Sequence, residues 1–332
     1  MNVGDASELL KMFSGKKMVV IGDLVADEYV YGTTSRISRE APILIVREDD
    51  REIRPGGAAN VVANIKAMGG DPLPVGLVGD DATGRLLVRT LENSGVDCSG
   101  IIVEQDRFTT TKTRVLAGGI NTVRQQMIRL DRLNTSKVSH EMMLKIETSF
   151  VHACNNASAV VVSDYGEGVV GKSIVNTVCR MADGGENIFV DSRFHVDMFH
   201  GVSSLVPNEP ELAAAAGFGI HEPEALERAG RWLLEKTESK AVLLKRGRNG
   251  MALFQPGVQT RFQGSYGSDE VADVTGAGDT VLAAWSLACV AGVDVELAMK
   301  IANVAGGIKV GKSGTAVVRS EELLAALKNM DL

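Results

Sequence analysis

Cysteine and histidine are scarce in this sequence of 332 residues, and neither is arranged to bind a metal ion. The four cysteines, Cys98, Cys154, Cys179 and Cys289, are far apart and form no C-x-x-C pair. The five histidines show no metal-ligand spacing. No signal-peptide pattern precedes the cysteines, so we expect reduced thiols in a cytoplasmic protein.

Long apolar runs and an excess of positive charge are absent as well. The longest apolar stretch, residues 281–292, is shorter than the roughly 20 residues that cross a bilayer, and it predicts a buried helix. Lys and Arg number 35 against 42 Asp and Glu, which gives a net charge of −7. A dedicated nucleic-acid binder would carry a basic face. We therefore expect neither a membrane nor a nucleic acid as a partner.

Aromatic residues make up only 5% of the chain, and 36 glycines outnumber 8 prolines. This composition favours tight turns and a core of alanine, valine and leucine. Hydrophobic residues reach 45% and charged residues 23%, as in folded globular proteins. No linker or shift in composition divides the sequence, so we expect residues 1–332 to form a single domain.

Five short apolar runs end abruptly at glycine or polar residues, which is typical of strands buried on both faces of a parallel sheet. They are residues 18–21, 159–162, 188–190, 204–206 and 241–244. Helical patterns at 58–68, 84–94 and 222–236 separate several of them. The alternation predicts a doubly wound α/β sheet, in which ligands bind at the carboxyl ends of the strands.

Two regions, residues 29–48 and 109–130, break this pattern because they look extended and lack a crossover helix. The second contains Gly118-Gly119 between two apolar segments, which predicts a β-hairpin. We interpret both regions as a small β lid that stands off the main sheet. The alternative is an antiparallel extension at the edge of that sheet.

The segment 273–280 reads DVTGAGDT and leads into the longest apolar stretch. Its small residues let successive N–H groups point at one place, and a helix beginning there adds its positive dipole end. This predicts an anion hole for a phosphoryl group, formed by Gly276, Ala277 and Gly278. Asp279 at its mouth would accept the proton of an attacking hydroxyl. The alternative is a glycine-rich turn in which Asp279 only caps the helix.

A second segment, residues 54–64, reads RPGGAANVVAN. Gly56 and Gly57 lead into a helical pattern that carries Asn60. Small residues let a polyhydroxyl ligand approach the backbone, and Asn60 offers both donors and acceptors to hydroxyl groups. This segment predicts a sugar-binding turn.

In this order, the segments 54–64 and 273–280 resemble the two signatures of the ribokinase (PfkB) family of ATP-dependent carbohydrate kinases. The resemblance covers nearly the whole chain. It implies a ribokinase-like α/β fold, with a doubly wound and mostly parallel sheet and a small β lid. It also implies ATP as the phosphoryl donor, Mg²⁺ as the metal and Asp279 as the catalytic base.

Further residues receive roles from the resemblance alone. The implied sugar-binding positions are Asp27, Gly56, Gly57, Asn60 and Asp164. The implied nucleotide-binding positions are Asn208, Lys245, Gly247, Gly250 and Asn303. Lys245 replaces a threonine that is frequent in the family. Asn208 and Glu211 would serve Mg²⁺ through water, and a monovalent cation would lie near Asp273 and Thr275.

Within the family, the sequence most resembles kinases that act on D-glycero-β-D-manno-heptose 7-phosphate. The similar segments are residues 31–42, 54–61, 112–116 and 125–131. This implies phosphorylation of the anomeric hydroxyl to the 1,7-bisphosphate, for ADP-heptose and lipopolysaccharide core precursors. Such kinases are often fused to a nucleotidyltransferase with an H-x-G-H motif. The sequence contains no H-x-G-H, so we expect the kinase alone.

The lid segments concentrate positive charge in an otherwise acidic protein. The basic residues are Arg36, Arg39, Lys112, Arg114 and Arg124. A sugar that already carries phosphate needs such partners, and we predict that Arg36, Lys112 and Arg114 bind it. The alternative is that these side chains are solvated and pair with acidic residues of the lid.

The lid also carries apolar residues on more than one face, namely Ile43, Ile45, Val115, Val123, Met127 and Ile128. A small sheet cannot bury both faces against one domain. We therefore expect a homodimer in which the lids of two subunits pair and help to close the sugar sites. The alternative is a monomer whose lid folds onto its own site.

Three other functions are alternatives to this interpretation, and the sequence rejects one of them. The first is another sugar kinase of the family, of the ribose, fructose or fructose-phosphate type. A catalytically inactive sugar-binding regulator would share the fold, but the intact Asp279 and anion hole disfavour it. An NAD-dependent dehydrogenase is rejected because Gly22-Asp23 after the first strand is no G-x-G-x-x-G.

Overall fold

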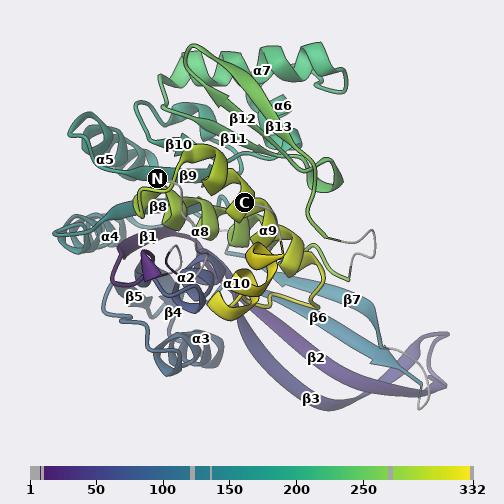
Figure 1. Ribbon diagram of the computed structural model, residues 1–332. Coiled ribbons are helices and arrows are strands. Elements are labelled where there is room, and N and C mark those ends of the chain that lie inside the picture. The colour runs from purple at the N-terminus through teal and green to yellow at the C-terminus, as the bar shows by residue number, and fades with distance from the viewer. Residues whose placement is uncertain (1–7, 9–10, 120–123, 135–136, 268–271, 330–332) are drawn as a thin grey trace.

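The computed structural model describes residues 8, 11–119, 124–134, 137–267 and 272–329. Within these ranges the chain forms one large β-sheet flanked by helices and one small sheet that projects from the main body (Figure 1). Val123, which belongs to the dimer prediction, lies outside the described residues.

The large sheet has nine strands in the order β13-β12-β11-β10-β9-β8-β1-β4-β5. The strands are β1 (Lys17–Gly22), β4 (Asp71–Gly79), β5 (Ile101–Glu104), β8 (Ala159–Asp164), β9 (Ile188–Ser192), β10 (Ser204–Leu205), β11 (Val242–Lys245), β12 (Met251–Gln255) and β13 (Val258–Gln263). From β11 across to β5 every neighbouring pair is parallel, and the pairs that involve β12 and β13 are antiparallel. The five apolar runs coincide with β1, β8, β9, β10 and β11, so the predicted mostly parallel sheet is confirmed.

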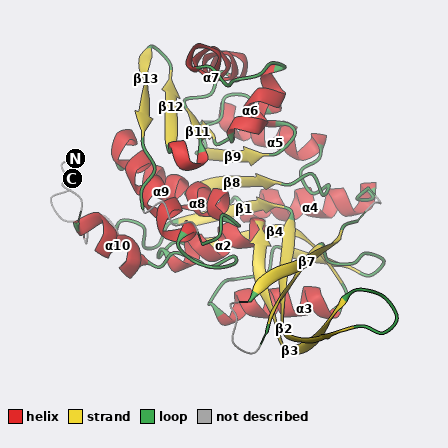
Figure 2. Ribbon diagram, turned by 90° about the vertical axis from the view of Figure 1, so that its right-hand side faces the viewer, coloured by secondary structure: helices red, strands yellow, loops and turns green. Residues whose placement is uncertain are grey.

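Helices cover both faces of the large sheet (Figures 1 and 2). They are α2 (Ala58–Ala67), α3 (Ala82–Asn93), α4 (His140–Ala153), α5 (Lys172–Asp183), α6 (Glu209–Ala216), α7 (Pro223–Thr237), α8 (Ala277–Val290), α9 (Val295–Val310) and α10 (Ser320–Lys328), with short 3-10 turns η1 (Val196–Met198) and η2 (Gly247–Asn249). Met18 and Val20 of β1 share a core with α2 and α8, whereas Val19 and Ile21 share the opposite core with α4 and α5. Successive side chains of a strand point to opposite faces, so a strand between two helix layers is apolar throughout.

Helix α8 contains most of the longest apolar stretch, and its residues 279–288 are buried. The predicted buried helix is therefore confirmed. None of the helices in the described ranges is long and apolar enough to cross a membrane.

The small sheet is the lid, with strands in the order β3-β2-β6-β7. Its strands are β2 (Leu24–Ile37), β3 (Leu44–Gly57), β6 (Thr111–Gly118) and β7 (Gln125–Arg132). Strands β2 and β6 are parallel, and the other pairs are antiparallel. In the described part of the chain these strands pair only with one another, so the lid does not extend an edge of the large sheet.

The lid strands are longer than the predicted segment 29–48, since β2 begins at Leu24 and β3 ends at Gly57. Residues 47–52 are all charged, a composition that disfavours a strand. They nevertheless pair with β2 because the lid stands in solvent, where most of these side chains stay hydrated. Strand β3 leads directly into α2, so the turn predicted to bind sugar lies at the base of the lid.

Candidate active site

The carboxylate of Asp279 lies in the first turn of α8 and has an exposed fraction of only 3%. Its Oδ2 accepts a hydrogen bond from Asn60 Nδ2 of α2 at 2.7 Å. Its Oδ1 accepts one from the Tyr165 hydroxyl, just after β8, at 2.6 Å. Burial raises the pKa of Asp279 to about 6, although the hydrogen bonds from Tyr165 and Asn60 lower it. Such a carboxylate is ionised at neutral pH and is a stronger base than an exposed aspartate, as general-base catalysis requires.

The chain before α8 turns tightly at Gly276, whose φ of 78° lies in the left-handed region. Among the described residues, the N–H groups of Gly276, Gly278 and Asp279 have no protein acceptor. They lie at the positive end of the α8 dipole, which suits an anion. The N–H of Ala277 differs, because it donates to the Val274 carbonyl at 3.2 Å. Ala277 therefore does not offer the free donor that the sequence predicts.

A second charged pair lies next to this helix turn. Lys245 Nζ, at the end of β11, forms an ion pair with the Asp191 carboxylate of β9. A Cβ placed on Gly278 would lie 3.4 Å from Lys245 Nζ, so the ammonium reaches the first turn of α8. Burial lowers the pKa of Lys245, but Asp191 and Glu211 outweigh it and hold the pKa above its usual value. The lysine therefore remains charged beside the free N–H groups.

Asn208 and Glu211, the predicted magnesium residues, form a capping box at the start of α6. Asn208 Oδ1 accepts from the Glu211 N–H at 2.9 Å, and Glu211 Oε2 accepts from the Asn208 N–H at 2.8 Å. Burial and the nearby Asp191 raise the pKa of Glu211. In the described residues no group of three or more His, Cys, Asp or Glu side chains could hold a metal ion. The few carboxylates here suit a cation held mainly by water and phosphate, which is the usual coordination of Mg²⁺.

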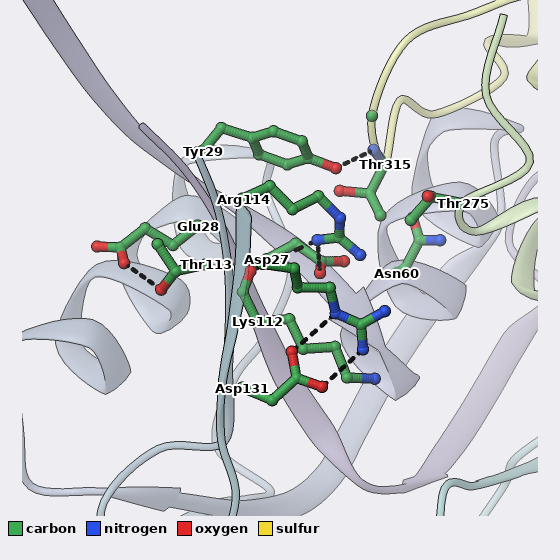
Figure 3. Close-up of polar contacts among 12 residues, drawn as sticks. Asp27, Glu28, Tyr29, Asn60, Lys112, Thr113, Arg114, Asp131, Thr275 and Thr315 are labelled. Atoms are coloured by element: carbon green, nitrogen blue, oxygen red, sulfur yellow. Dashed lines mark hydrogen bonds and ion pairs between the residues drawn. The ribbon is translucent and has the colours of Figure 1, made fainter. Parts of the chain in front are cut away.

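At the base of the lid, Asp27 of β2 and Arg114 of β6 form a buried ion pair (Figure 3). Burial raises the pKa of Asp27, although Arg114 lowers it. Gly56 lies against this carboxylate, since a Cβ on Gly56 would be 2.9 Å from Asp27 Cγ. Gly57 caps α2 with a φ of 54°. The structure thus brings Asp27, Gly56 and Gly57 together as predicted, and it pairs Arg114 with Asp27.

One face of the lid carries a basic set. Lys112, Arg114 and Asp131 lie on the side of the lid that faces Asn60 and Thr275 (Figure 3). In the register of β6 and β7, Arg114 lies opposite Arg129, and Lys112 lies opposite Asp131, so all four share this face. Arg129 donates to Asp131 with two bonds of 2.7 Å.

This basic face is linked to the Asp279 site, because Lys112 Nζ lies 5.0 Å from the centre of the Tyr165 ring. The other predicted lid cations lie elsewhere. Arg36 is exposed and is nine positions after Asp27 on β2, about 30 Å away at roughly 3.3 Å per residue. Arg36 therefore does not reach the Asp27 region of its own chain. Arg124 pairs with Asp49 at 3.6 Å, in agreement with a solvated pair.

Two predicted sugar ligands are already engaged with the protein. Asn60 is fully buried, and its Oδ1 accepts from Asn64 Nδ2 at 3.1 Å while its Nδ2 binds Asp279. The carboxylate of Asp164 accepts from the Gly166 N–H at 2.9 Å and from the Ser192 hydroxyl at 2.6 Å. Asn60 thus orients the predicted base, and Asp164 holds the turn after β8.

Two of the predicted nucleotide residues, Gly250 and Asn303, meet at Gly264. Gly247 and Gly250 lie in the turn between β11 and β12, with φ values of 55° and 79°. A Cβ on Gly250 would be 2.6 Å from the Gly264 carbonyl carbon. Asn303 of α9 donates to the Gly264 carbonyl at 2.7 Å. The turn that follows Lys245 and helix α9 therefore meet at Gly264.

The place predicted for a monovalent cation is occupied by protein groups. The Asp273 carboxylate accepts from the N–H groups of Thr275 at 2.8 Å and Gly314 at 2.9 Å. The Asp273 carbonyl accepts from Lys309 Nζ at 3.2 Å. An ammonium group already lies beside Asp273, so the residues present do not fit a second cation.

Three residues of the site were not predicted as site residues. Tyr165 directly follows β8, and Asp191 lies near the end of β9. Because ligands bind at the carboxyl ends of parallel strands, these positions could have identified both residues as candidates from the sequence. Arg129 had no such signal, because only the β6–β7 register places it beside Arg114.

The chain is similar to known proteins in sequence and in fold. The sequence profile described as "pfkB family carbohydrate kinase" matches residues 16–322. The chain is 37% identical over 327 residues to "Bifunctional protein HldE" of Desulfatibacillum aliphaticivorans, covering 97% of this chain and 65% of that protein. It is 37% identical over 311 residues to the protein of the same name from Geobacter sulfurreducens, covering 93% and 62%. The chain thus spans less than two thirds of the length of these relatives.

Solved structures share the fold at low identity. An Arabidopsis thaliana ribokinase complexed with ribose and ATP is similar with a TM-score of 0.72 and 21% identity, covering 95% of this chain and 100% of that one. Phosphofructokinase-2 from Escherichia coli, in complex with substrates and products, has a TM-score of 0.76 and 17% identity, covering 94% and 100%. These likenesses concern the arrangement of the sheet and helices.

Proposed function

The chain belongs to the pfkB family of carbohydrate kinases, and we propose that it phosphorylates the anomeric hydroxyl of D-glycero-β-D-manno-heptose 7-phosphate. It is an ATP-dependent sugar kinase with a ribokinase-like fold. The heptose assignment rests on the resemblance of four segments, most of them in the lid, and on the similarity to the two HldE proteins. The product would be the 1,7-bisphosphate, a precursor of ADP-heptose.

The observation that carries the proposal is the position of Asp279 between the free N–H groups of α8 and the basic face of the lid. Its carboxylate would take the proton from the attacking hydroxyl of the sugar. The N–H groups of Gly276, Gly278 and Asp279 would stabilise the charge of the phosphoryl group in transfer. Asn60 and Tyr165 hold the carboxylate in place during this step.

The basic face supports a substrate that already carries phosphate. Lys112, Arg114 and Arg129 contribute three positive charges, and Asp27 and Asp131 neutralise two of them. A neutral sugar needs no such charge, whereas a phosphate monoester gains charge-assisted hydrogen bonds from it. The set is therefore a recognition site for the 7-phosphate group in our proposal.

The nucleotide would lie along the turn of Gly247 and Gly250 and beside Asn303, with Lys245 at the phosphates. Mg²⁺, when bound, would neutralise phosphate charge during transfer. Asn208 and Glu211 would hold its water ligands, and Asp191 keeps Lys245 oriented toward the first turn of α8.

We also propose that residues 1–332 act as one kinase domain and that two copies pair through their lids. Exposed apolar side chains of the lid support the pairing, since Ile43, Leu44, Ile128 and Leu130 are all more than half exposed. In such a dimer each lid would help to close the sugar sites.

The test is a coupled assay of ADP release over a panel of substrates. The panel contains the heptose 7-phosphate, the same heptose without phosphate, fructose 6-phosphate, fructose and ribose. We expect the highest kcat/KM with the heptose 7-phosphate and a second phosphate on its anomeric oxygen. A preference for the unphosphorylated heptose, or for another sugar of the panel, would overturn the substrate assignment. The variant Asp279→Asn is the control for ADP release that does not depend on the catalytic base.

A further inference from the structure

Lys309 is a fully buried lysine that the chemistry described above does not use. It lies in the last turn of α9, and its exposed fraction is 0%. Lysine is almost never fully buried without partners. Its Nζ donates to two backbone carbonyls, those of Asp273 and Lys312, each at 3.2 Å. The ammonium is therefore held by main-chain oxygens instead of by a direct ion pair with a carboxylate in the described residues.

The two carbonyls belong to segments that must stay together for the site to form. Asp273 opens the loop that continues into Gly276 and the free N–H groups of α8. Lys312 lies in the turn after α9, and this turn donates from the Gly314 N–H to the Asp273 carboxylate at 2.9 Å. Lys309 thus joins the active-site loop to the turn after α9, and the bond from Gly314 to Asp273 joins the same two segments.

The same turn also contacts the lid. The Thr315 N–H donates to the Tyr29 hydroxyl at 3.0 Å (Figure 3). Arg54 Nη1 donates to the Ser313 carbonyl at 3.2 Å. The turn after α9 therefore contacts the base of the lid, and Lys309 ties this turn to the loop that opens at Asp273.

Backbone carbonyls that converge on a buried positive charge are the groups that replace the hydration shell of an alkali cation. The charged groups near Lys309 are the carboxylates of Asp273 and Asp279 and the cations of Arg54 and Lys312. Burial lowers the pKa of the Lys309 ammonium, and Asp273 raises it. A further cation among these groups would meet a like charge and compete for the same oxygens.

We propose that Lys309 is a built-in replacement for a monovalent cation, so that this kinase binds its nucleotide and turns over without added K⁺. In this role Lys309 is a positioning residue, which acts through the Asp273–Gly276 loop and does not touch the substrate. The proposal rests on the kinase activity of the family but not on the identity of the sugar. The proposal is tested by nucleotide binding, so its outcome is independent of which sugar the enzyme phosphorylates.

The first experiment uses the wild-type protein and calorimetric titration with a non-hydrolysable ATP analogue and Mg²⁺. The titration is repeated in K⁺ and in tetramethylammonium at equal ionic strength. We expect dissociation constants that agree within about twofold in the two salts. An affinity that rises tenfold or more with K⁺ would overturn the proposal, because the site would then need an external cation.

The second experiment compares Lys309→Ala, which leaves room for a small cation, with Lys309→Met, which fills that room without charge. In tetramethylammonium both should bind the analogue at least tenfold more weakly than the wild type. K⁺ or NH₄⁺ should restore most of the affinity of Lys309→Ala and little of that of Lys309→Met. Equal behaviour of the two variants in all salts would contradict the proposal.

Thermal unfolding in the same salts shows whether the variants are folded under the conditions of the titration. Lys309→Ala should melt at a higher temperature in K⁺ or NH₄⁺ than in tetramethylammonium, and Lys328→Ala, an exposed lysine of α10, should not differ. If Lys309→Ala does not fold in any salt, the wild-type titration decides alone.

Discussion

At the residue scale, the pKa of Asp279, the proposed base, sets the pH range in which we predict activity. Burial raises its pKa to about 6, compared with 3.8 for an unperturbed aspartate. The proposed base can act only when it is deprotonated, so we predict activity above this pKa and its loss as the pH falls through it. The same shift means that ionised Asp279 costs roughly 3 kcal/mol of folding stability above pH 6, at about 1.36 kcal/mol per unit.

The Tyr165 hydroxyl lowers the pKa of Asp279 by donating a hydrogen bond to the ionised form. We predict that Tyr165→Phe moves the acid limb of the kcat/KM profile upward by about one pH unit, since a bond to a charged group contributes about 1.5–3 kcal/mol. Measurement of kcat/KM from pH 5 to pH 9 checks this. The control is Tyr31→Phe, whose hydroxyl binds Glu52 on the lid. A profile of Tyr165→Phe that overlays the wild type would contradict the assigned role.

The carboxylate of Asp279 itself is expected to be indispensable. Asp279→Asn should lower kcat by about 10²–10⁴, because an amide cannot accept the proton of the sugar hydroxyl. Nucleotide affinity should change little, since the N–H groups of the α8 turn remain. Single-turnover ADP release and calorimetry measure the two quantities. The exposed Asp71→Asn serves as the control, and a near wild-type kcat for Asp279→Asn would remove its role as the base.

At the scale of elements, the start of α8 depends on a residue without a side chain. Gly276 has a φ of 78°, and a Cβ there would lie 2.5 Å from Asn60 Nδ2. Asn60 in turn is tied to Asn64, and Asn64 Oδ1 accepts from the Thr280 hydroxyl at 3.2 Å. Helices α2 and α8 are thus joined by amide and hydroxyl groups next to the turn at Gly276.

We predict that Gly276→Ala destabilises the protein and also lowers kcat by at least tenfold. The left-handed backbone costs about 1–2 kcal/mol for a residue with a Cβ, and the displaced Asn60 would release Asp279. Gly257→Ala is a matched control, since Gly257 has a φ of 67° and a Cβ there would have no atom within 4 Å. Chemical denaturation should show a similar backbone cost for both, whereas only Gly276→Ala should lose activity. Equal kcat values would contradict the close packing at this turn.

At the scale of the whole molecule, the lid leaves apolar side chains in solvent. Ile37, Ile43, Leu44, Ile128 and Leu130 are each more than half exposed. Strands β2 and β3 extend well beyond the base of the lid, so these residues cannot all be covered by the domain that carries them (Figure 1). A second lid would cover them and would protect the outer strands of the sheet.

We therefore predict a homodimer in solution, with twice the chain mass of 35.3 kDa by light scattering at micromolar concentration. Ile128→Asp should shift the mass toward the monomer and lower activity together. Leu144→Asp is a matched control, because Leu144 on α4 has the same exposed fraction of 51%. A fully active wild-type monomer would contradict the prediction.

The sequence alone determined the parallel sheet and the tight turn that begins α8. Runs such as residues 18–21 and 159–162 are apolar at every position, and only a strand buried on both faces requires this. The segment 273–280 combines small residues with a carboxylate before an apolar helix, and this local pattern specifies its own geometry. Both features depend on neighbours in the sequence, which is why they could be predicted.

The tertiary structure alone decided which side chains meet. Asn60 was predicted to bind sugar, but its 2.7 Å contact with Asp279 depends on the packing of α2 against α8. Arg129 joins the basic face only through the register of β6 and β7. In the sequence, nothing distinguishes Lys309 from the other lysines. Only the fold brings the carbonyls of Asp273 and Lys312 to its ammonium. Such contacts join residues that are distant in sequence, and their distances are set by packing that no local pattern encodes.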